Sequence, residues 1–200
     1  MLVTLEGIDG SGKSTLYEGL QARLSDVDPV FTREPGSPYL GAAVRAAIAE
    51  NTDPMAEAAL FVADHAVHLA TVVRPALEAG RLVISDRYTD SRFAYQQVSL
   101  KAVHPNPKAW LTAVHKGWSI DPDLTFLLNL SPETSLARTT GRGSAEHFEQ
   151  KEFLEQVQKN YLDRVAEQPA RFVVIDATLP PETILDFVET SIRNRLKKQK

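Results

Sequence analysis

Short apolar runs alternate with longer amphipathic stretches along almost the whole chain. The short runs are rich in Val, Ile, Leu, Phe and Thr, which is typical of parallel strands that are buried on both faces. They predict five strands: Leu2–Glu6, Pro29–Thr32, Leu82–Ser85, Leu124–Leu130 and Arg171–Ile175. Strands that alternate with helices form a parallel sheet with helices on both of its faces. The pattern therefore predicts an α/β fold, a three-layer αβα sandwich around a five-stranded parallel sheet.

The amphipathic stretches predict the helices. A first helix begins at Lys13, with Leu16, Leu20 and Leu24 at four-residue spacing. The others are predicted at Tyr39–Glu50, from Pro54 through Val73, and at Thr89–Leu100, Lys108–Lys116, Pro132–Thr140, Glu149–Glu167 and Pro181–Lys198. Because proline lacks a backbone N–H and its ring crowds the preceding turn, we expect Pro75 to kink or end the long helix that begins at Pro54.

Length, composition and charge narrow the class of protein. A chain of 200 residues suits one domain with a sizeable core, so we expect a single domain over residues 1–200. The absence of cysteine excludes disulfides and thiolate metal sites, and it fits a reducing cytoplasm. No apolar stretch approaches the length of a transmembrane span, and the N-terminus resembles a strand rather than a signal peptide, so we expect no membrane partner. The net charge of −4 argues against a nucleic-acid partner.

A phosphate-binding loop follows the first predicted strand. The segment from Gly7 to Ser14 matches G-x-x-x-x-G-K-[ST], and it lies between a strand and a helix, where such a loop must lie. Glycines let backbone N–H groups face phosphate oxygens, Lys13 supplies a positive charge, and the Ser14 hydroxyl can ligate Mg²⁺. A glycine-rich turn with a chance match is the alternative. The residues expected to bind the nucleotide are Gly7, Ile8, Asp9, Gly10, Ser11, Gly12, Lys13, Ser14 and Thr15.

Charged side chains follow the second and third predicted strands. Arg33 and Glu34 follow the second strand, and Asp86 and Arg87 follow the third. In a parallel sheet these ends share one edge with the phosphate loop, and two arginines there can clamp a second phosphorylated ligand. Asp86 lies where a carboxylate often holds Mg²⁺. The alternatives are surface arginines paired with Glu34 and Asp86, and a helix N-cap role for Asp86.

Together these motifs resemble the thymidylate kinase family, and the variants at residues 63–66 and 85–92 look most like its archaeal members. The resemblance covers nearly the whole chain, at the phosphate loop, Thr32–Gly36, Gly41 with Arg45, Leu60–Asp64, Asp86–Tyr88, Ser91–Gln96, Pro122–Thr125 and Ile175–Ala177. It implies a P-loop NTPase fold of the nucleoside monophosphate kinase kind, with a short lid. It also implies transfer of the γ-phosphoryl group of ATP to dTMP with Mg²⁺, by a homodimer.

The resemblance further implies roles for single residues. The implied catalytic residues are Lys13, Asp9, Arg33, Arg87 and Arg142, and the implied metal ligands are Ser14, Asp9 and Asp86. The implied dTMP-binding residues are Arg33, Glu34, Phe61, His65, Arg87, Arg92, Tyr95 and Gln96, and Arg138 joins the phosphate loop in binding ATP. Glu34 is expected to order Arg33, Phe61 to stack on thymine and Tyr95 to lie against the deoxyribose. Taken alone, Phe61 and Tyr95 are ordinary helix and core residues.

Residues 138–148 are polar and basic, which predicts a lid that closes over the phosphates. Some relatives have arginine at the position of Gly10, and chains with glycine there resemble the class whose catalytic arginine comes from the lid. Arg142 is the first candidate for that arginine and Arg138 the second. A disordered, solvated loop is the alternative.

Two departures from the family pattern concern the base pocket. Many relatives have arginine at His65 and a small polar residue at Arg92, so Arg92 is a candidate to contact thymine in place of residue 65. His65 and His68 share a helix face, but the sequence shows no third metal ligand at a suitable spacing. Alternative functions are another nucleoside monophosphate kinase acting on dUMP or UMP, a deoxynucleoside kinase with Glu34 as base, and a non-catalytic nucleotide-binding module.

Overall fold

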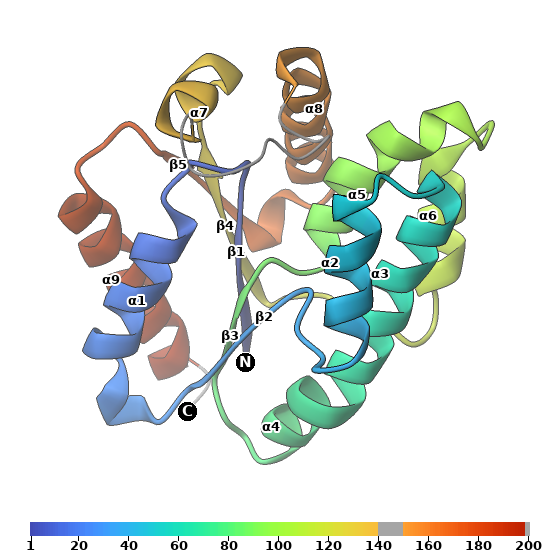
Figure 1. The fold of residues 1–200 in the computed structure, drawn as a ribbon. Helices are drawn as coiled ribbons and strands as arrows, with labels where there is room; N and C mark the ends of the chain where they lie inside the picture. Colours follow the sequence, from blue (N-terminus) through green and yellow to red (C-terminus); the bar gives the residue numbers. More distant parts are fainter. Residues whose placement is uncertain (140–149, 199–200) are drawn as a thin grey trace.

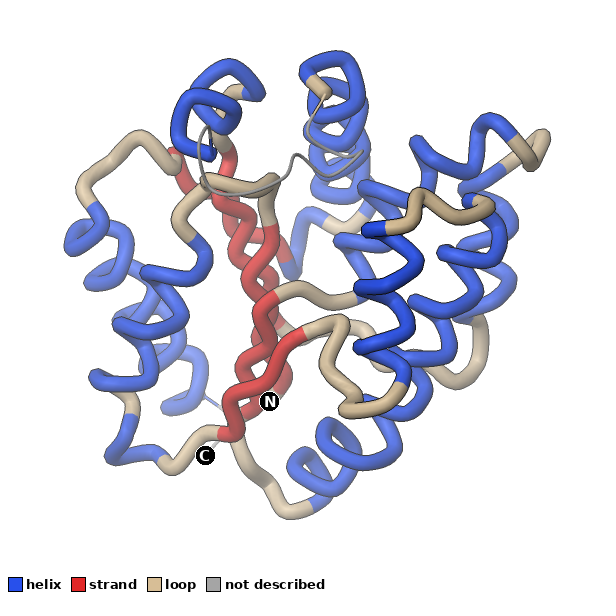
Figure 2. Tube along the Cα trace, viewed as in Figure 1, coloured by secondary structure: helices blue, strands red, loops and turns tan. Residues whose placement is uncertain are grey.

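A five-stranded parallel sheet forms the centre of the computed structural model, which describes residues 1–139 and 150–198. The strand order is β2-β3-β1-β4-β5, and each neighbouring pair is parallel. Figure 2 shows the strands (red) in the centre of the molecule, with helices (blue) on both sides of them. The strands are β1 Leu2–Glu6, β2 Val30–Arg33, β3 Val83–Asp86, β4 Leu124–Asn129 and β5 Phe172–Asp176. The predicted α/β fold is confirmed, and each predicted strand boundary lies within one residue of the observed one.

Helices cover both faces of the sheet. They are α1 Lys13–Arg23, α2 Leu40–Ala49, α3 Pro54–His68, α4 Arg74–Glu78, α5 Thr89–Ser99, α6 Pro107–His115, α7 Pro132–Thr139, α8 Lys151–Glu167 and α9 Pro181–Lys198. Short 3-10 turns lie at Ser25–Val27, Leu100–Ala102 and Pro169–Arg171, and a π-helical turn, η2, spans Leu69–Val73. Figure 1 shows α1 and α9 on one side of the sheet and α2, α3, α5 and α6 on the other. The helix ends predicted at Thr140 and Glu149 lie outside the described residues.

The long helix that begins with α3 does not end at Pro75. Instead α3, η2 and α4 run on without a break, and the backbone N–H of Arg74 donates to the carbonyl of Leu69, five residues back. In an α-helix the ring of Pro75 would crowd the carbonyl four residues before it. The wider π-helical turn accommodates the proline, so the helix does not end there.

This continuous helix, Pro54–Glu78, is long and apolar enough to cross a membrane by length and composition alone. The expectation that no apolar stretch approaches that length was therefore wrong. Buried core helices pass the same test, and 39% of its most apolar window is buried inside the molecule. The helix also carries four buried polar residues, Glu57, Asp64, His65 and His68. Asp64 accepts hydrogen bonds from the backbone N–H groups of Gly36 and Ser37. These contacts are those of a helix packed against protein.

The largest hydrophobic cluster lies between the sheet and α1, α8 and α9. It includes Leu5, Leu20, Phe126, Val157 and Val188, whose side chains are fully buried. Burying each such side chain stabilises the fold by about 1.5–3 kcal/mol. The cluster fixes the strands relative to one another. Their relative positions in turn determine where the charged residues at the carboxyl ends of the strands lie.

The register brings the predicted functional segments together. Asp86 at the end of β3 lies beside Leu5 of β1 on one side and beside Arg33 of β2 on the other. The loop that follows β1 therefore begins next to the charged residues that follow β2 and β3. This edge of the sheet is where ligands bind in open parallel sheets.

Candidate active site

Two cavities open at the carboxyl ends of the strands, and Asp9, Asp86 and Arg87 line both of them. The first cavity, of about 310 Å³, is walled by the end of β2 and by α2, α3 and α5. The second cavity, of about 570 Å³, is walled by the loop after β1, the start of α1, Arg138 and the loop after β5. All the residues proposed from the sequence to bind dTMP line the first cavity except His65.

The phosphate loop forms one wall of the second cavity, which is lined by every residue from 9 to 15. The Nζ of Lys13 donates to the carbonyl oxygens of Gly7 and Ile8, at 2.9 and 3.0 Å. Burial, together with the nearby charge of Arg87, lowers the pKa of Lys13 to about 8. The lysine therefore remains mostly protonated at neutral pH, and a phosphate in the cavity would favour its charged form further.

Two glycines of this loop are required by close approaches. A Cβ on Gly7 would lie 2.6 Å from the carbonyl oxygen of Leu128, which belongs to β4. Gly10 has φ +73°, and a Cβ there would lie 3.0 Å from the carbonyl oxygen of Ser135 in α7. A longer side chain at Gly10 would run into α7, so position 10 cannot supply an arginine to the cavity without moving that helix.

The opposite wall of the second cavity was not assigned from the sequence. It consists of residues 177–181, which connect β5 to α9. Arg138 connects the two walls, because its Nη1 donates to the carbonyls of Gly10 and Ala177 at 3.3 and 3.1 Å. Ligands bind at the carboxyl ends of parallel strands, and this loop follows β5, so the sequence could have predicted that it lines the nucleotide site.

Arg87 lies between the two cavities. Its Nη2 lies 2.5 Å from Oδ1 of Asp9, and its Nη1 donates to Gly7 O and Ser91 Oγ. Burial alone would raise the pKa of Asp9, but the charges of Arg87 and Lys13 outweigh it and lower that pKa. Arg87 also has φ +66°, an uncommon backbone conformation for a residue with a side chain. Such conformations concentrate at functional sites, where the surrounding fold enforces them.

Asp86, the neighbour of Arg87, has one carboxylate oxygen without a hydrogen-bond partner among the described residues. This oxygen, Oδ1, is buried. The N-cap position of α5 belongs to Tyr88, so Asp86 does not cap that helix. A buried carboxylate oxygen without a partner fits the preference of Mg²⁺ for oxygen ligands, and Ser14 lines the adjoining second cavity.

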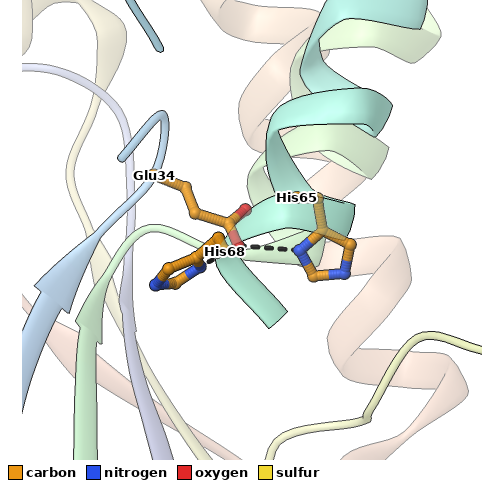
Figure 3. Close-up of side chains that lie close together, drawn as sticks. All are labelled: Glu34, His65 and His68. Atoms are coloured by element: carbon orange, nitrogen blue, oxygen red, sulfur yellow. Dashed lines mark hydrogen bonds and ion pairs between the residues drawn. The ribbon is translucent and has the colours of Figure 1, made fainter. Parts of the chain in front are cut away.

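Glu34 lines the first cavity and is the centre of a buried polar cluster. Figure 3 shows Glu34 with His65 and His68 of this cluster. Its Oε1 accepts hydrogen bonds from Nδ1 of His65 and Nδ1 of His68, both at 2.7 Å, and its Oε2 accepts one from Arg92. Burial would raise the pKa of Glu34, but the charge of Arg92 and these hydrogen bonds hold it well below its usual range. Glu34 therefore orders Arg92, whereas the sequence suggested that it orders Arg33.

The same cluster supplies the third potential metal ligand that was not evident from the sequence. Ligand atoms of Glu34, His65 and His68 lie within 4.8 Å of one another. However, the guanidinium of Arg92 is paired with Glu34 and already neutralises the carboxylate. A cation there would have to be bound next to that guanidinium, so the arrangement favours a hydrogen-bonded cluster over a metal centre.

His65 lies behind the wall of the first cavity. Its side chain is fully buried, and its Nε2 is hydrogen-bonded to Ser119 Oγ at 2.9 Å. Burial, together with the charge of Arg92, lowers the pKa of His65 to about 4, so the ring is neutral at physiological pH. Phe61 and Tyr95, in contrast, line the cavity, and the guanidinium of Arg87 lies 5.1 Å from the centre of the Tyr95 ring.

Several residues of the site had no role assigned from the sequence. Arg45, Ile48 and Ser91 line the first cavity; Arg45 and Ser91 had been noted only as parts of family motifs. Glu6, at the end of β1, is fully buried and accepts a hydrogen bond from Ser91. The sequence could have indicated a role for Glu6, because it is a carboxylate at the end of an apolar strand and directly precedes the phosphate loop. Arg142 and most of the predicted lid lie outside the described residues.

Known proteins with similar sequences show which family this chain belongs to. Residues 5–188 match the family described as thymidylate kinase. The chain belongs to the thymidylate kinase family. A probable thymidylate kinase of Methanocorpusculum labreanum is 68% identical to it over 193 residues, covering 96% of this chain and 98% of that protein.

Two further relatives carry the same printed name. A probable thymidylate kinase of Methanospirillum hungatei is 59% identical, over 98% of this chain and 95% of that protein. One from Natronomonas pharaonis is 42% identical, over 99% of this chain and 100% of that protein. The resemblance to archaeal members of the family is thereby confirmed.

Proposed function

We propose that this protein is a thymidylate kinase that transfers the γ-phosphoryl group of ATP to dTMP, giving dTDP and ADP. The observation that carries the proposal is the pair of cavities that meet at Asp9, Asp86 and Arg87. Phosphoryl transfer needs a donor and an acceptor that approach each other in line, with positive charge between them. Two adjoining cavities with the half-buried Arg87 at their junction provide such an arrangement.

ATP occupies the second cavity in this proposal. Lys13 and the backbone N–H groups of the phosphate loop hold its phosphates, and Arg138 lies beside them. Asp86 and Ser14 hold Mg²⁺, with Asp9 close by. When bound, Mg²⁺ neutralises charge on the transferred phosphoryl group.

The acceptor, dTMP, occupies the first cavity. Arg33 and Arg87 hold its phosphate, Phe61 and Tyr95 flank the nucleoside, and Arg92 and Gln96 line the far part of the cavity. The attacking phosphate oxygen is already anionic, so positioning and charge neutralisation supply the rate without a general base.

A deoxynucleoside kinase is less well supported, because it needs a carboxylate base. Glu34 was the candidate, but its pKa is lowered well below its usual range and both of its oxygens are hydrogen-bonded to neighbouring side chains. Such a carboxylate is a weak base. The same residues therefore favour a nucleoside monophosphate as acceptor.

We further infer that residues 1–200 act as one kinase domain, with residues 138–148 as a lid and Arg142 as the arginine that reaches the transferred group. The close contact of Gly10 with α7 supports a lid arginine. We place the protein in the cytoplasm, without a nucleic-acid or membrane partner. We also propose a homodimer, because a second copy can cover the part of the apolar helix Pro54–Glu78 that is not buried within one chain.

The first test is ADP release with Mg²⁺ and ATP, with dTMP, dUMP, UMP, dCMP and thymidine offered in parallel. We expect the highest turnover with dTMP and none with thymidine. Turnover with thymidine alone would favour the deoxynucleoside kinase, and turnover without any acceptor dependence would overturn the proposal. Light scattering of the same sample measures the oligomeric state, and a monomeric mass would contradict the homodimer.

A further inference from the structure

Glu6 is a fully buried carboxylate that directly precedes the phosphate loop but lies outside both cavities. Its Oε1 accepts a hydrogen bond from the backbone N–H of Tyr88 at 2.8 Å. Its Oε2 accepts hydrogen bonds from Ser91 Oγ and from Tyr161 Oη, at 2.5 and 3.0 Å. The two oxygens of one side chain therefore hold the residue that follows Arg87 and a hydroxyl that contacts Arg87.

The backbone of Arg87 is held by hydrogen bonds on both sides. Its φ of +66° is uncommon for a residue with a side chain, so the surrounding fold has to enforce it. Its N–H donates to the carbonyl of Leu5 at 2.9 Å, and its carbonyl accepts from Ser85 Oγ at 2.7 Å. The hydrogen bond from Tyr88 N–H to Glu6 holds the peptide that follows Arg87.

The guanidinium of Arg87 contacts three partners. Its Nη2 donates to Asp9 Oδ1 at 2.5 Å, and its Nη1 donates to Gly7 O at 3.2 Å and to Ser91 Oγ at 3.1 Å. A serine hydroxyl has one hydrogen and two lone pairs. Because Ser91 donates its hydrogen to Glu6, its lone pairs remain available to Arg87.

An ionised carboxylate is the group that gives the Ser91 hydroxyl this direction, because it accepts hydrogen bonds and cannot donate one. In Glu6→Gln the amide oxygen takes the place of Oε1, since the Tyr88 N–H needs an acceptor. The amino group then faces Ser91 and Tyr161 as a donor. The variant therefore keeps the backbone contact and removes both the charge and the acceptor that orient Ser91.

We propose that Glu6 is a positioning residue, which holds Arg87 in place for the phosphate of the acceptor through Ser91 and the backbone of Tyr88. This inference rests on the proposed function, in which Arg87 holds the phosphate of dTMP. Hydrogen bonds between a guanidinium and a phosphate require a matching direction of the two groups. An arginine that is free to turn therefore binds the phosphate less tightly.

The direct test compares the binding of dTMP and of thymidine, which lacks the phosphate. The Kd of thymidine divided by the Kd of dTMP measures what the phosphate contributes to binding. We expect this ratio to fall about tenfold in Glu6→Gln, through weaker binding of dTMP alone. Burial raises the pKa of Glu6 to about 7, so the calorimetric titrations are made above that pH, where the carboxyl is ionised. Loss of folded protein would weaken the binding of both ligands and leave the ratio unchanged.

Tyr161→Phe is the matched control. Tyr161 is buried, lies outside both cavities and donates to the same oxygen of Glu6 as Ser91 does. Its substitution removes a buried hydroxyl from the same cluster but keeps the hydrogen bond between Ser91 and Glu6. We expect Tyr161→Phe to retain most of the ratio.

A double-mutant cycle tests whether Glu6 acts through Ser91. Ser91 lines the first cavity, so Ser91→Ala by itself also changes the wall of the acceptor site. If Glu6 acts through Ser91, adding Glu6→Gln to Ser91→Ala lowers the ratio little further, because the link is already broken. The full tenfold effect of Glu6→Gln in that background would contradict the proposed path.

The outcomes separate this inference from the proposed function. An unchanged ratio in Glu6→Gln, or an equal fall in Tyr161→Phe, overturns the positioning role even if dTMP is the best substrate. If the wild type turns over no dTMP, the proposed function fails, and the binding ratio still decides the role of Glu6 because it needs no catalysis. A wild type that binds dTMP no more tightly than thymidine overturns the inference. If Glu6→Gln does not fold by near-UV circular dichroism, an unchanged ratio in Ser91→Ala overturns the inference and a lower ratio supports it.

Discussion

The buried carboxyl of Glu6 predicts a specific pH dependence of stability. Glu6 is fully buried, and its Oε1 accepts a hydrogen bond from the backbone N–H of Tyr88 at 2.8 Å. Its Oε2 accepts from Ser91 Oγ and from Tyr161 Oη, at 2.5 and 3.0 Å. Burial, with the nearby charge of Asp90, raises the pKa of Glu6 to about 7, against 4.5 for an ordinary glutamate.

The sign of the effect follows from proton binding. Between pH 4.5 and about 7 the unfolded chain has released this proton, whereas the folded protein keeps it. The free energy of unfolding contributed by Glu6 is therefore fully present below pH 4.5 and is lost as the pH rises to about 7. At about 1.4 kcal/mol per pKa unit, the loss is about 3 kcal/mol.

The variant Glu6→Gln removes the titration and keeps hydrogen-bonding atoms at both positions. We expect its stability relative to the wild type to improve by about 3 kcal/mol between pH 4.5 and 7, because the wild type alone loses stability there. Urea unfolding followed by tryptophan fluorescence at several pH values measures the difference in free energy of unfolding between the variant and the wild type. The other carboxylates are present in both proteins, so their contributions to this difference cancel. Glu18→Gln, at an exposed position of α1, is the control for the substitution itself. A stability difference between Glu6→Gln and the wild type that does not change with pH would refute the reasoning.

Three further predictions concern other parts of the structure. Gly10→Ala should cost more stability than Gly80→Ala in urea unfolding and should also weaken ATP binding. Both glycines have φ near +70°, a conformation that costs about 1–2 kcal/mol for alanine. Only the Cβ at position 10 would also meet a backbone oxygen, that of Ser135, so equal losses of stability in the two variants would contradict this close approach. Asp90→Asn removes the carboxylate that pairs with two buried arginines and should cost about 3–5 kcal/mol in urea unfolding. Asp26→Asn breaks an exposed ion pair and should cost much less, and equally small costs for the two variants would contradict the structural role of Asp90. Arg142→Ala should lower kcat on the order of 10³-fold with little change in the KM for dTMP, and unchanged turnover would exclude it as the transition-state arginine.

The strands and the phosphate loop could be predicted because their signals are local. A strand buried on both faces needs an apolar run, and each observed boundary lies within one residue of the predicted one. The loop needs its glycines at fixed spacing, since a Cβ on Gly7 would collide with β4. Pro75 is the counterexample, because a π-helical turn absorbed a proline that the local rule treats as a helix breaker.

The partners of the charged residues could not be predicted in the same way. The sequence placed Glu34 beside Arg33, but the fold pairs it with Arg92, 58 positions away, and with two histidines of α3. His115 had no motif to mark it, yet it positions the Nε of Arg92. Such pairs depend on where side chains from separate helices point, which spacing along the chain does not specify.

The sequence by itself determined the alternation of strands and helices, the phosphate loop and the strand ends that carry Arg33 and Arg87, because each depends on neighbours in the chain. Only the tertiary structure decided that the pKa of Glu6 is raised to about 7. It alone also decided that Asp86 keeps a buried oxygen and Arg92 a buried nitrogen that have no hydrogen-bond partner among the described residues. The physical reason is that burial and the distance between charges set these properties, and both arise only when distant segments pack together.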